Sequence, residues 1–425
     1  MMPSLITILH MNDPMKNCGQ IFVFNPKRFA MTNAKTAFVD PRLGEPFLLT
    51  PGPLTTAYSV KEAMLRDWGS WDGDFRAMTK SMCDQLVALI GDTKGEFACV
   101  PMQGSGSFCC EAMLGSMVPR DGKVLVLANG AYGLRAAETL RVMGRAYTLI
   151  DKGDYLPPRG DEVGRALDAD PTISHVIAIH CETSSGILNP VAEIAEVVAA
   201  RGRKLLIDSM SAFGAVDLDV NRIQYEAMVS SANKCIEGVP GFGFVIARKS
   251  TLEVAKGNAH SLSLDVHAQW AAMVKTGQWR FTPPTHVVAA FLEALRLHAL
   301  EGGVAGRGAR YMRNRDVMVA GMRGLGFETL LADTWLSPII VTFFNPAHPN
   351  FVFSTFYDLM KAKGFIIYPG KLTVVDSFRV GCIGQMDEHI MRRVVAAAAE
   401  VLAEMGVDTA APPAAAIAER AKLAA

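Results

Sequence analysis

The stretch KLLIDSMSAFGAVDLDVNRIQYEAMVSSANKCIEGVPGFG at residues 204–243 contains two short apolar runs, each followed by an ionisable residue. The first run, LLI, ends at Asp208. The second, MVSSA, precedes Asn233, Lys234 and a Gly/Pro-rich turn. Short Val/Ile/Leu-rich runs bounded by turn residues are typical of buried strands. The pattern therefore predicts a carboxylate at the end of one strand and an amine just past another.

An acid and an amine placed in this way suit a pyridine cofactor that carries an aldehyde. The carboxylate of Asp208 can hold the ring nitrogen protonated, and the amine of Lys234 can form a Schiff base with the aldehyde. In the alternative interpretation, Asp208 caps a turn and Lys234 is a solvated loop lysine. The two residues alone do not decide between these interpretations, so the rest of the chain has to.

Working outward from this stretch, the chain alternates between apolar runs and helical patterns. The runs are FACVP (97–101), VLVLA (124–128), AYTLI (146–150), HVIAIH (175–180), KLLID (204–208), MVSSA (228–232) and FGFVIA (242–247). Helical spacing of apolar residues separates several of them, as in 191–202. This alternation predicts an α/β fold, with a mostly parallel seven-stranded sheet covered by helices on both faces.

The rest of the chain is divided by its patterns. Residues 60–68 and 286–303 are expected to be helical, and a second alternating block at 337–406 predicts a smaller C-terminal α/β domain. We therefore expect an N-terminal extension at 1–45, whose order the sequence leaves open. A large cofactor-binding domain follows at 46–305, with its N-terminal segment reaching the active site. The small domain spans 306–408, and an Ala/Pro-rich tail spans 409–425.

Composition excludes several classes of function. Lys+Arg and Asp+Glu balance at 42 each, so there is no basic excess to attract nucleic acid or a membrane surface. The eight cysteines show neither C-x-x-C nor zinc-like spacing with histidine, so we expect no metal site and a reducing, cytoplasmic setting. The N-terminus does not resemble a signal peptide, and no stretch is long and apolar enough to span a membrane.

Polar turns follow three of the expected strands. Residues 104–107, GSGS, open a helix and are predicted to cradle a phosphate; the alternative is an ordinary flexible turn. Tyr132 lies among glycines and is suited to stacking on a flat ring, unless it is a core aromatic. Thr183 is suited to bonding a phosphate or ring hydroxyl, or else satisfies a turn. Ligands of open α/β sheets bind at the carboxyl ends of the strands, where these turns and Asp208 all fall.

Two further features complete the candidate set. Arg379 opens a strand of the smaller domain, and its guanidinium suits a carboxylate or a phosphonate, although a surface ion pair explains it equally well. The loop KTGQWRFTPP at 275–284 is rigid, polar and aromatic, or is simply a turn between domains. The chain contains no H-E-x-x-H and no G-x-S-x-G, so metalloprotease and serine-hydrolase chemistry have no support.

Between about residues 47 and 406 the chain resembles the 2-aminoethylphosphonate–pyruvate transaminases. This family belongs to the fold-type I pyridoxal-phosphate class, which includes alanine–glyoxylate aminotransferase. The resemblance rests on the motifs LLTPGPLTT, QGSGSF, NGAYG, ADPTISH, SSANKCIEGVPGFGFVIAR, SLSLD, QWRFTPPTH and GFIIYPGK. It implies a pyridoxal 5′-phosphate-dependent aminotransferase of phosphonate degradation, which converts 2-aminoethylphosphonate and pyruvate into 2-phosphonoacetaldehyde and L-alanine.

The resemblance also implies roles for individual residues. Lys234 carries the cofactor and moves the proton, Asp208 pairs with the ring nitrogen, and Arg379 holds the acidic group of the substrate. Trp279 and Thr282 are expected to reach the cofactor phosphate of a neighbouring subunit, which implies a homodimer. The implied cofactor-binding set is Ser105, Gly106, Ser107, Tyr132, Thr183, Asp208, Asn233, Lys234, Trp279 and Thr282.

Three other functions stay open. The first is an alanine–glyoxylate or serine–pyruvate type aminotransferase with the same cofactor. The second is a lyase such as a cysteine desulfurase, which needs a mobile cysteine, whereas Cys382 lies inside an expected strand. The third is a binding protein without activity, against which the joint presence of Asp208, Lys234 and Arg379 argues.

Overall fold

The computed structural model describes residues 44–370 and 375–424, all of which belong to one compact unit, Phe38–Ala425. Nearly all of the expected N-terminal extension lies outside the described residues. Within them, no helix combines the length and the apolar character needed to cross a membrane.

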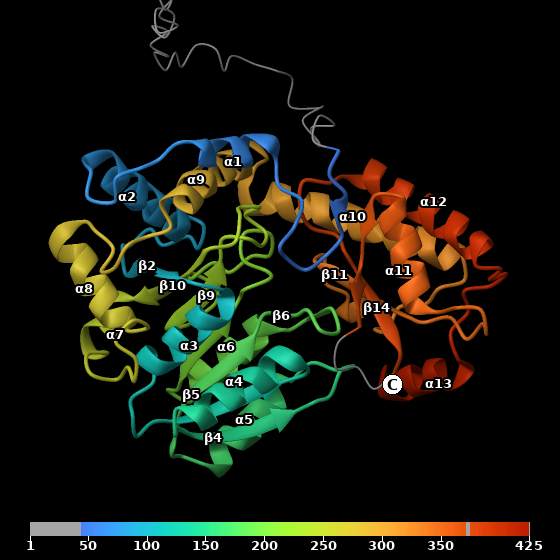
Figure 1. The fold of residues 1–425 in the computed structure, drawn as a ribbon. Coiled ribbons are helices and arrows are strands. Elements are labelled where there is room, and N and C mark those ends of the chain that lie inside the picture. The colour runs from blue at the N-terminus through green and yellow to red at the C-terminus, as the bar shows by residue number, and fades with distance from the viewer. Residues whose placement is uncertain (1–43, 371–374, 425) are drawn as a thin grey trace, which may run out of the picture. The chain divides into compact units, whose positions relative to one another are not determined.

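A single sheet contains all seven strands that the sequence predicts (Figure 1). They are β2 (Phe97–Gln103), β3 (Lys123–Ala128), β4 (Ala146–Asp151), β5 (Ile173–Ile179), β8 (Lys204–Asp208), β9 (Ala227–Ser231) and β10 (Phe242–Arg248). Their order is β2-β10-β9-β8-β5-β3-β4, and every neighbouring pair is parallel except the two that involve β10. The prediction of a mostly parallel seven-stranded sheet is confirmed, and six carboxyl ends meet at one edge.

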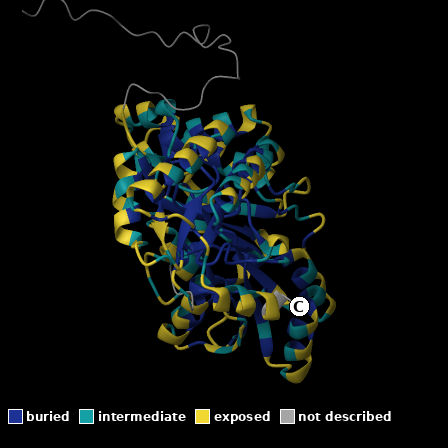
Figure 2. Ribbon diagram, turned by 90° about the vertical axis from the view of Figure 1, so that its right-hand side faces the viewer, coloured by how far each residue is buried: buried dark blue, intermediate teal, exposed yellow. Residues whose placement is uncertain are grey.

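Helices cover both faces of this sheet. One apolar core contains α3 (Gly106–Met117), α4 (Ala131–Val142), α7 (Lys249–Val254) and α8 (Val266–Thr276). The opposite core contains α2 (Gly73–Ala88), α5 (Gly160–Ala169), α6 (Val191–Ala200) and α9 (Thr285–Leu300). Because side chains alternate along a strand, Val124 and Val126 join the first core and Leu125 and Leu127 the second. The strands are therefore buried on both sides (Figure 2), except the edge strand β4, whose residues are exposed or half-buried.

A second group of elements forms around the antiparallel sheet β11-β14-β13. The strands are β11 (Ile340–Phe344), β13 (Tyr368–Pro369) and β14 (Ser377–Gly381), and the helices are α10 (Gly303–Gly324), α11 (Phe353–Ala362), α12 (Glu388–Glu404) and α13 (Ala414–Ala424). The remaining elements are short: β1 (Phe47–Leu48), α1 (Tyr58–Glu62), β6 (Cys181–Glu182), β7 (Ile187–Leu188), β12 (Phe365–Ile366) and the 3₁₀ turns Ala63–Leu65 and Asp333–Trp335.

The segment before α1 is attached to this second group. β1 pairs in parallel with β12, and Leu49 belongs to the same apolar core as β11 and β14. We call residues 48–55 the strap, because it runs from this core to the edge of the large sheet. The helix expected at 60–68 ends early, at Leu65, because the backbone of Arg66 is extended. The domain boundaries at residues 305 and 408 stay a prediction.

Phe378 of β14 is the centre of an aromatic cluster. Its ring centroid lies 5.4 Å from that of Phe356, 5.5 Å from that of Phe327 and 5.7 Å from that of Phe343. The side chain is fully buried. The cluster fixes β14, and with it the position of the neighbouring Arg379.

Replacing Phe378 with Ala is expected to lower the free energy of unfolding by about 3–5 kcal/mol, because the ring leaves a cavity among rigid neighbours. Urea unfolding followed by circular dichroism measures this loss. Val352→Ala is the control, since Val352 is 51% exposed, and it should change the free energy of unfolding by less than about 0.5 kcal/mol. A loss below about 1 kcal/mol for Phe378→Ala would show that the cluster is not tightly packed.

Candidate functional site

Lys234 lies just beyond the carboxyl end of β9, and the strap contacts it. Its Nζ donates a hydrogen bond to the carbonyl oxygen of Pro51, at 2.8 Å. Burial lowers the pKa of the Lys234 amine to about 8, although Cys235 and Asp208 act in the opposite direction. About one tenth of the amine is therefore free base at pH 7, far more than for an ordinary lysine, and the free base is the form that a nucleophile or proton acceptor needs.

Gly52 allows the strap to approach the lysine. Its φ is +117°, in the region that favours glycine. A Cβ at this position would lie 2.7 Å from Cδ and 2.8 Å from Nζ of Lys234. A side chain would therefore displace either the strap or the amine.

Asp208 ends β8 at the same edge and is 6% exposed. Its Oδ1 accepts from the backbone N–H of Met210 at 2.9 Å, and its Oδ2 lies 3.8 Å from the Cys110 sulfur. Burial raises the pKa of Asp208 to about 6, and the nearby Glu182 carboxylate adds to the rise. Among the described residues no lysine, arginine or histidine forms an ion pair with it. A buried carboxylate of this kind favours a cationic partner.

The predicted phosphate cradle lies at the start of α3. Ser105 is the residue that precedes the helix, and its hydroxyl makes no capping hydrogen bond. Gly106 and Ser107 begin the helix, where backbone N–H groups and the helix dipole favour an anion. Arg135 of α4 donates to the Ser107 hydroxyl at 3.1 Å and lies over the Tyr132 ring, 4.9 Å from its centroid. A positive charge that the sequence did not indicate thus reinforces the cradle.

Tyr132 is held by a cap built from a distant segment. Gly130, which precedes α4, has no side chain to cap the helix. Glu182 of β6 caps the helix in place of such a side chain. Its Oε2 accepts from the N–H groups of Tyr132 (2.9 Å) and Gly133 (3.3 Å). The Ser184 hydroxyl accepts from Ala131 N–H at 3.1 Å and donates to Glu182 Oε1 at 2.6 Å.

This cap leaves no space for a side chain at residue 130. A Cβ on Gly130 would lie 2.3 Å from the Ser184 hydroxyl and 2.6 Å from Cγ of Glu182. Burial raises the pKa of Glu182, although its hydrogen bonds oppose the shift. Glu182 was not predicted from the sequence, because its partners lie about 50 residues away.

Thr183, which directly follows β6, and Arg379 of β14 contact each other. Arg379 donates from Nη1 to the carbonyl oxygen of Thr183 at 2.7 Å and from Nε to that of Pro369 at 3.0 Å. Its guanidinium also lies 4.9 Å from the ring centroid of Tyr368. The hydroxyl of Thr183 is buried and has no hydrogen-bond partner in the described part of the chain. It is therefore an unsatisfied group that a ligand can satisfy.

A cavity of about 740 Å³ joins most of these residues. Of the residues predicted from the sequence, it is lined by Ser105, Gly106, Ser107, Tyr132, Asp208, Asn233 and Lys234. Residues not predicted to bind also line it, among them Gly52, Cys110, Arg135 and Met210. Arg379 lies close enough to lower the pKa of Lys234.

Thr183 and Arg379 contact each other but do not line this cavity, and the other two predicted residues, Trp279 and Thr282, lie elsewhere. Trp279 is buried, and its indole N–H donates to the Thr79 hydroxyl at 3.2 Å. Thr282 is exposed on the surface. Neither lines the cavity of its own subunit, and their predicted role at a neighbouring subunit stays a prediction.

Known proteins resemble this chain over most of its length. A profile of the aminotransferase class-V family matches residues 148–354. A 2-aminoethylphosphonate–pyruvate transaminase of Rhizobium meliloti (strain 1021) is 77% identical over 383 residues, 90% of this chain and 100% of that protein. A 2-aminoethylphosphonate–pyruvate transaminase of Paraburkholderia xenovorans (strain LB400) is 72% identical over 386 residues, 91% and 99% of the two chains.

A solved structure shows the same fold. The ureidoglycine–glyoxylate aminotransferase of Bacillus subtilis superposes with a TM-score of 0.78 over 89% of this chain and 98% of that one. Its sequence identity is 18%, so the likeness concerns the fold alone. The predicted fold-type I architecture is confirmed.

The lowered pKa of Lys234 predicts a specific pH dependence in the cofactor-free chain. Acetic anhydride reacts only with the free base, so labelling of Lys234, read by mass spectrometry, should rise with pH to half its maximum at about pH 8. Lys80 is the control: its side chain is 77% exposed, and Asp84 raises its pKa above the ordinary value. A midpoint for Lys234 as high as that of Lys80 would contradict the burial argument.

Proposed function

The chain belongs to the family of 2-aminoethylphosphonate–pyruvate transaminases, and on this premise we propose that it transfers the amino group of 2-aminoethylphosphonate to pyruvate. The products are 2-phosphonoacetaldehyde and L-alanine, and the cofactor is pyridoxal 5′-phosphate. The observation that carries the proposal is the meeting of Lys234 and Asp208 in one cavity with the cradle at the start of α3.

The residues of the cavity fit this cofactor. The start of α3, with Ser105, Gly106 and Ser107, offers N–H and hydroxyl donors for a phosphate, and Arg135 adds positive charge. Thr183 does not line the cavity, but its unsatisfied hydroxyl would offer a bond to a ring substituent. Asp208 is a buried carboxylate without a cation, which suits a protonated ring nitrogen. Tyr132 offers an aromatic ring for stacking, and Asn233 lines the cavity beside Lys234.

When bound, pyridoxal 5′-phosphate supplies an aldehyde that captures the amino group and a ring that withdraws electrons from the substrate carbon. Lys234 is the residue to which we assign covalent attachment and the movement of the proton, because its free base is available near neutral pH. Asp208 is largely ionised above its pKa of about 6 and so presents negative charge at neutral pH. The cap formed by Glu182 and Ser184 keeps Tyr132 in place.

Arg379 is the residue that we assign to the acidic group of the substrate. Two carbonyl oxygens fix the plane of its guanidinium, which leaves other N–H donors for a ligand. A guanidinium can bond a carboxylate or a phosphonate, so one residue can serve both 2-aminoethylphosphonate and pyruvate.

We also propose that the active unit is a homodimer, because Trp279 and Thr282 lie away from the cavity of their own subunit. Apolar side chains are exposed around this loop: Leu262 is 73%, Val274 71% and Phe281 47% exposed. Exposed apolar side chains in one region favour a contact with another protein surface. The side chain of Thr282 would then reach the phosphate across the contact, whereas the indole N–H of Trp279 already bonds Thr79.

A cytoplasmic location is likewise a proposal. The seven cysteines of the described residues are free, and five of them are buried. Burial raises the pKa of Cys109, Cys181 and Cys382 to about 12, which keeps these thiols protonated. Free, protonated thiols are compatible with a reducing compartment.

A substrate panel tests the function. We expect rapid alanine formation from 2-aminoethylphosphonate and pyruvate, and a kcat/KM at least about 100-fold lower for serine or alanine with glyoxylate. Arg379→Lys should lower kcat/KM for both natural substrates about 10- to 100-fold, because the paired donors of the guanidinium are lost. Faster turnover of serine or alanine with glyoxylate would instead assign the chain to the alanine–glyoxylate type.

Hybrid dimers test the shared site. Lys234→Ala subunits should be inactive, and Thr282→Asp subunits should lose about tenfold or more of kcat/KM, because the carboxylate repels the phosphate. Hybrids purified through two different tags should regain about half of the wild-type activity, since one of their two sites is then intact. Hybrids no more active than about half of the Thr282→Asp dimers would show that Thr282 does not act across subunits.

A further inference from the structure

Glu237 has an unusual backbone conformation three residues after Lys234. Its φ is +64°, and among the described residues it is the only one other than glycine with a positive φ. A side chain disfavours this left-handed region, so the conformation persists only where the surroundings enforce it. The turn is tight, since the N–H of Glu237 donates to the carbonyl oxygen of Lys234 at 2.7 Å. The backbone of Glu237 is thus bonded directly to that of the lysine.

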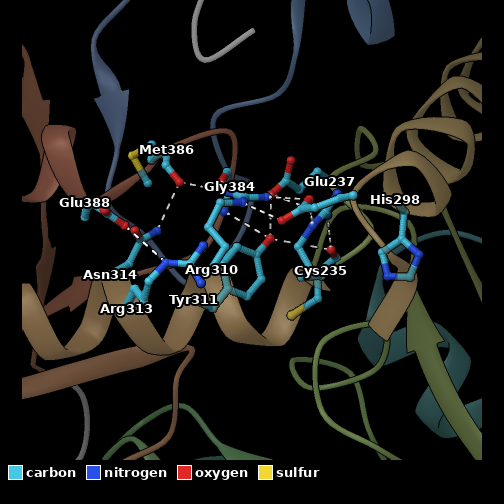
Figure 3. Close-up of polar contacts among 12 residues, drawn as sticks. Cys235, Glu237, His298, Arg310, Tyr311, Arg313, Asn314, Gly384, Met386 and Glu388 are labelled. Atoms are coloured by element: carbon cyan, nitrogen blue, oxygen red, sulfur yellow. Dashed lines mark hydrogen bonds and ion pairs between the residues drawn. The ribbon is translucent and has the colours of Figure 1, made fainter. Parts of the chain in front are cut away.

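Buried side chains of α10 hold this turn. Glu237 Oε1 accepts from Arg310 Nη2 at 2.7 Å and from the Tyr311 hydroxyl at 2.6 Å. Arg307 Nη1 donates to the carbonyl oxygen of Cys235 at 2.5 Å. Both the residue next to Lys234 and the carboxylate of Glu237 are therefore fixed by one helix (Figure 3).

The same helix face binds a second segment. Arg310 Nη1 donates to the carbonyl oxygens of Gly384 (2.6 Å) and Met386 (2.8 Å). Asn314 Nδ2 donates to those of Cys382 and Met386, each at 3.0 Å. Residues 382–386 directly follow β14, the strand that contains Arg379. In Figure 3 the side chains of α10 lie between Glu237 and this segment.

The side chains of α10 that make these contacts form one buried polar cluster. Arg307, Arg310, Tyr311 and Asn314 recur at the helical spacing that places them on one face, and each is at most 3% exposed. Glu301 also bonds Arg307 and Arg310, at 2.6 and 2.7 Å, so two acids balance two bases. None of these residues lines the cavity. The cluster therefore lies outside the cavity. It nevertheless bonds both the turn that follows Lys234 and the segment that follows Arg379.

We propose that Glu237 is a positioning residue: its carboxylate, held by Arg310 and Tyr311, fixes the turn that places Lys234 and couples it to the segment that follows Arg379. The inference rests on the proposed function, in which Lys234 holds the cofactor and Arg379 the acid of the substrate. A change at Glu237 then alters both the chemical step and substrate binding. A merely structural role would lower only stability or the fraction of active sites.

The test compares three full-length variants with the wild type. Glu237→Gln keeps the size of the side chain but removes its charge. Tyr311→Phe removes one hydroxyl, a milder change that keeps the test usable if Glu237→Gln does not fold. Arg313→Gln is the matched control, because Arg313 lies on the same helix and pairs with Glu388 (3.2 Å), but at the surface, where its side chain is 58% exposed.

Two readouts are measured. In the cofactor-loaded enzyme, kcat per titrated site should fall about 10- to 100-fold for Glu237→Gln and less for Tyr311→Phe, with a higher KM for 2-aminoethylphosphonate. In the cofactor-free chain, the midpoint of Lys234 acetylation should move above its wild-type pH in both variants, because a looser turn exposes the amine to water. Arg313→Gln should match the wild type in both readouts.

The outcomes separate the positioning role of Glu237 from a merely structural role, and both from a failure of the proposed function. If folded Glu237→Gln and Tyr311→Phe keep the wild-type kcat per site, KM and labelling midpoint, Glu237 is not a positioning residue. The same conclusion follows if Arg313→Gln causes equal losses. If the wild type itself does not transaminate 2-aminoethylphosphonate, the proposed function fails. The labelling of Lys234 in the cofactor-free chain still tests the placement of the amine in that case.

Discussion

The burial of the Lys234 amine at the edge of the large sheet is the constraint on which the rest of the site depends. Lowering its pKa from 10.5 to about 8 corresponds to about 3 kcal/mol against the charged form. The hydrogen bond that the amine donates to the carbonyl oxygen of Pro51 partly offsets the loss of water. That acceptor comes from the strap, whose residue Leu48 pairs with β12 and whose residue Leu49 accepts from the N–H of Gly381 in β14, at 2.9 Å. A reactive amine therefore exists only when both groups of elements are assembled.

The two buried acids near the cavity differ in their hydrogen-bond partners. Asp208 and Glu182 are both buried, and burial raises the pKa of each. Glu182 is satisfied by backbone N–H groups at the start of α4, whereas Asp208 has a single backbone N–H and a thiol. The two carboxylates look alike in sequence, but only Asp208 lines the cavity, and it has fewer partners than Glu182. Because the hydrogen bonds of Glu182 are satisfied, its role is structural, whereas Asp208 remains available to a cationic ligand.

The sequence predicted the large sheet correctly because each strand is a short apolar run between turns, a local signal that does not depend on distant residues. It placed Asp208, Lys234, Tyr132 and the cradle at one edge for the same reason. Glu182 escaped prediction because its role arises from contacts 50 residues away. The Glu237 turn escaped too: the adjacent Gly238 is the residue that intrinsic preference favours for a positive φ, yet Glu237 adopts it because α10 supplies partners for its carboxylate.

The geometry also limits what Arg379 can select. At least two of its five N–H donors are used by the carbonyl oxygens of Thr183 and Pro369. A carboxylate needs two donors for a paired contact, and the remaining donors can supply one to each of its oxygens. A phosphonate has three oxygens and is left with one that the guanidinium does not reach in the same plane. Preference for the phosphonate therefore requires donors around that third oxygen, and these must come from outside β14. The strap is tied to the same sheet as Arg379 and also contacts Lys234, so it is a candidate source of such donors.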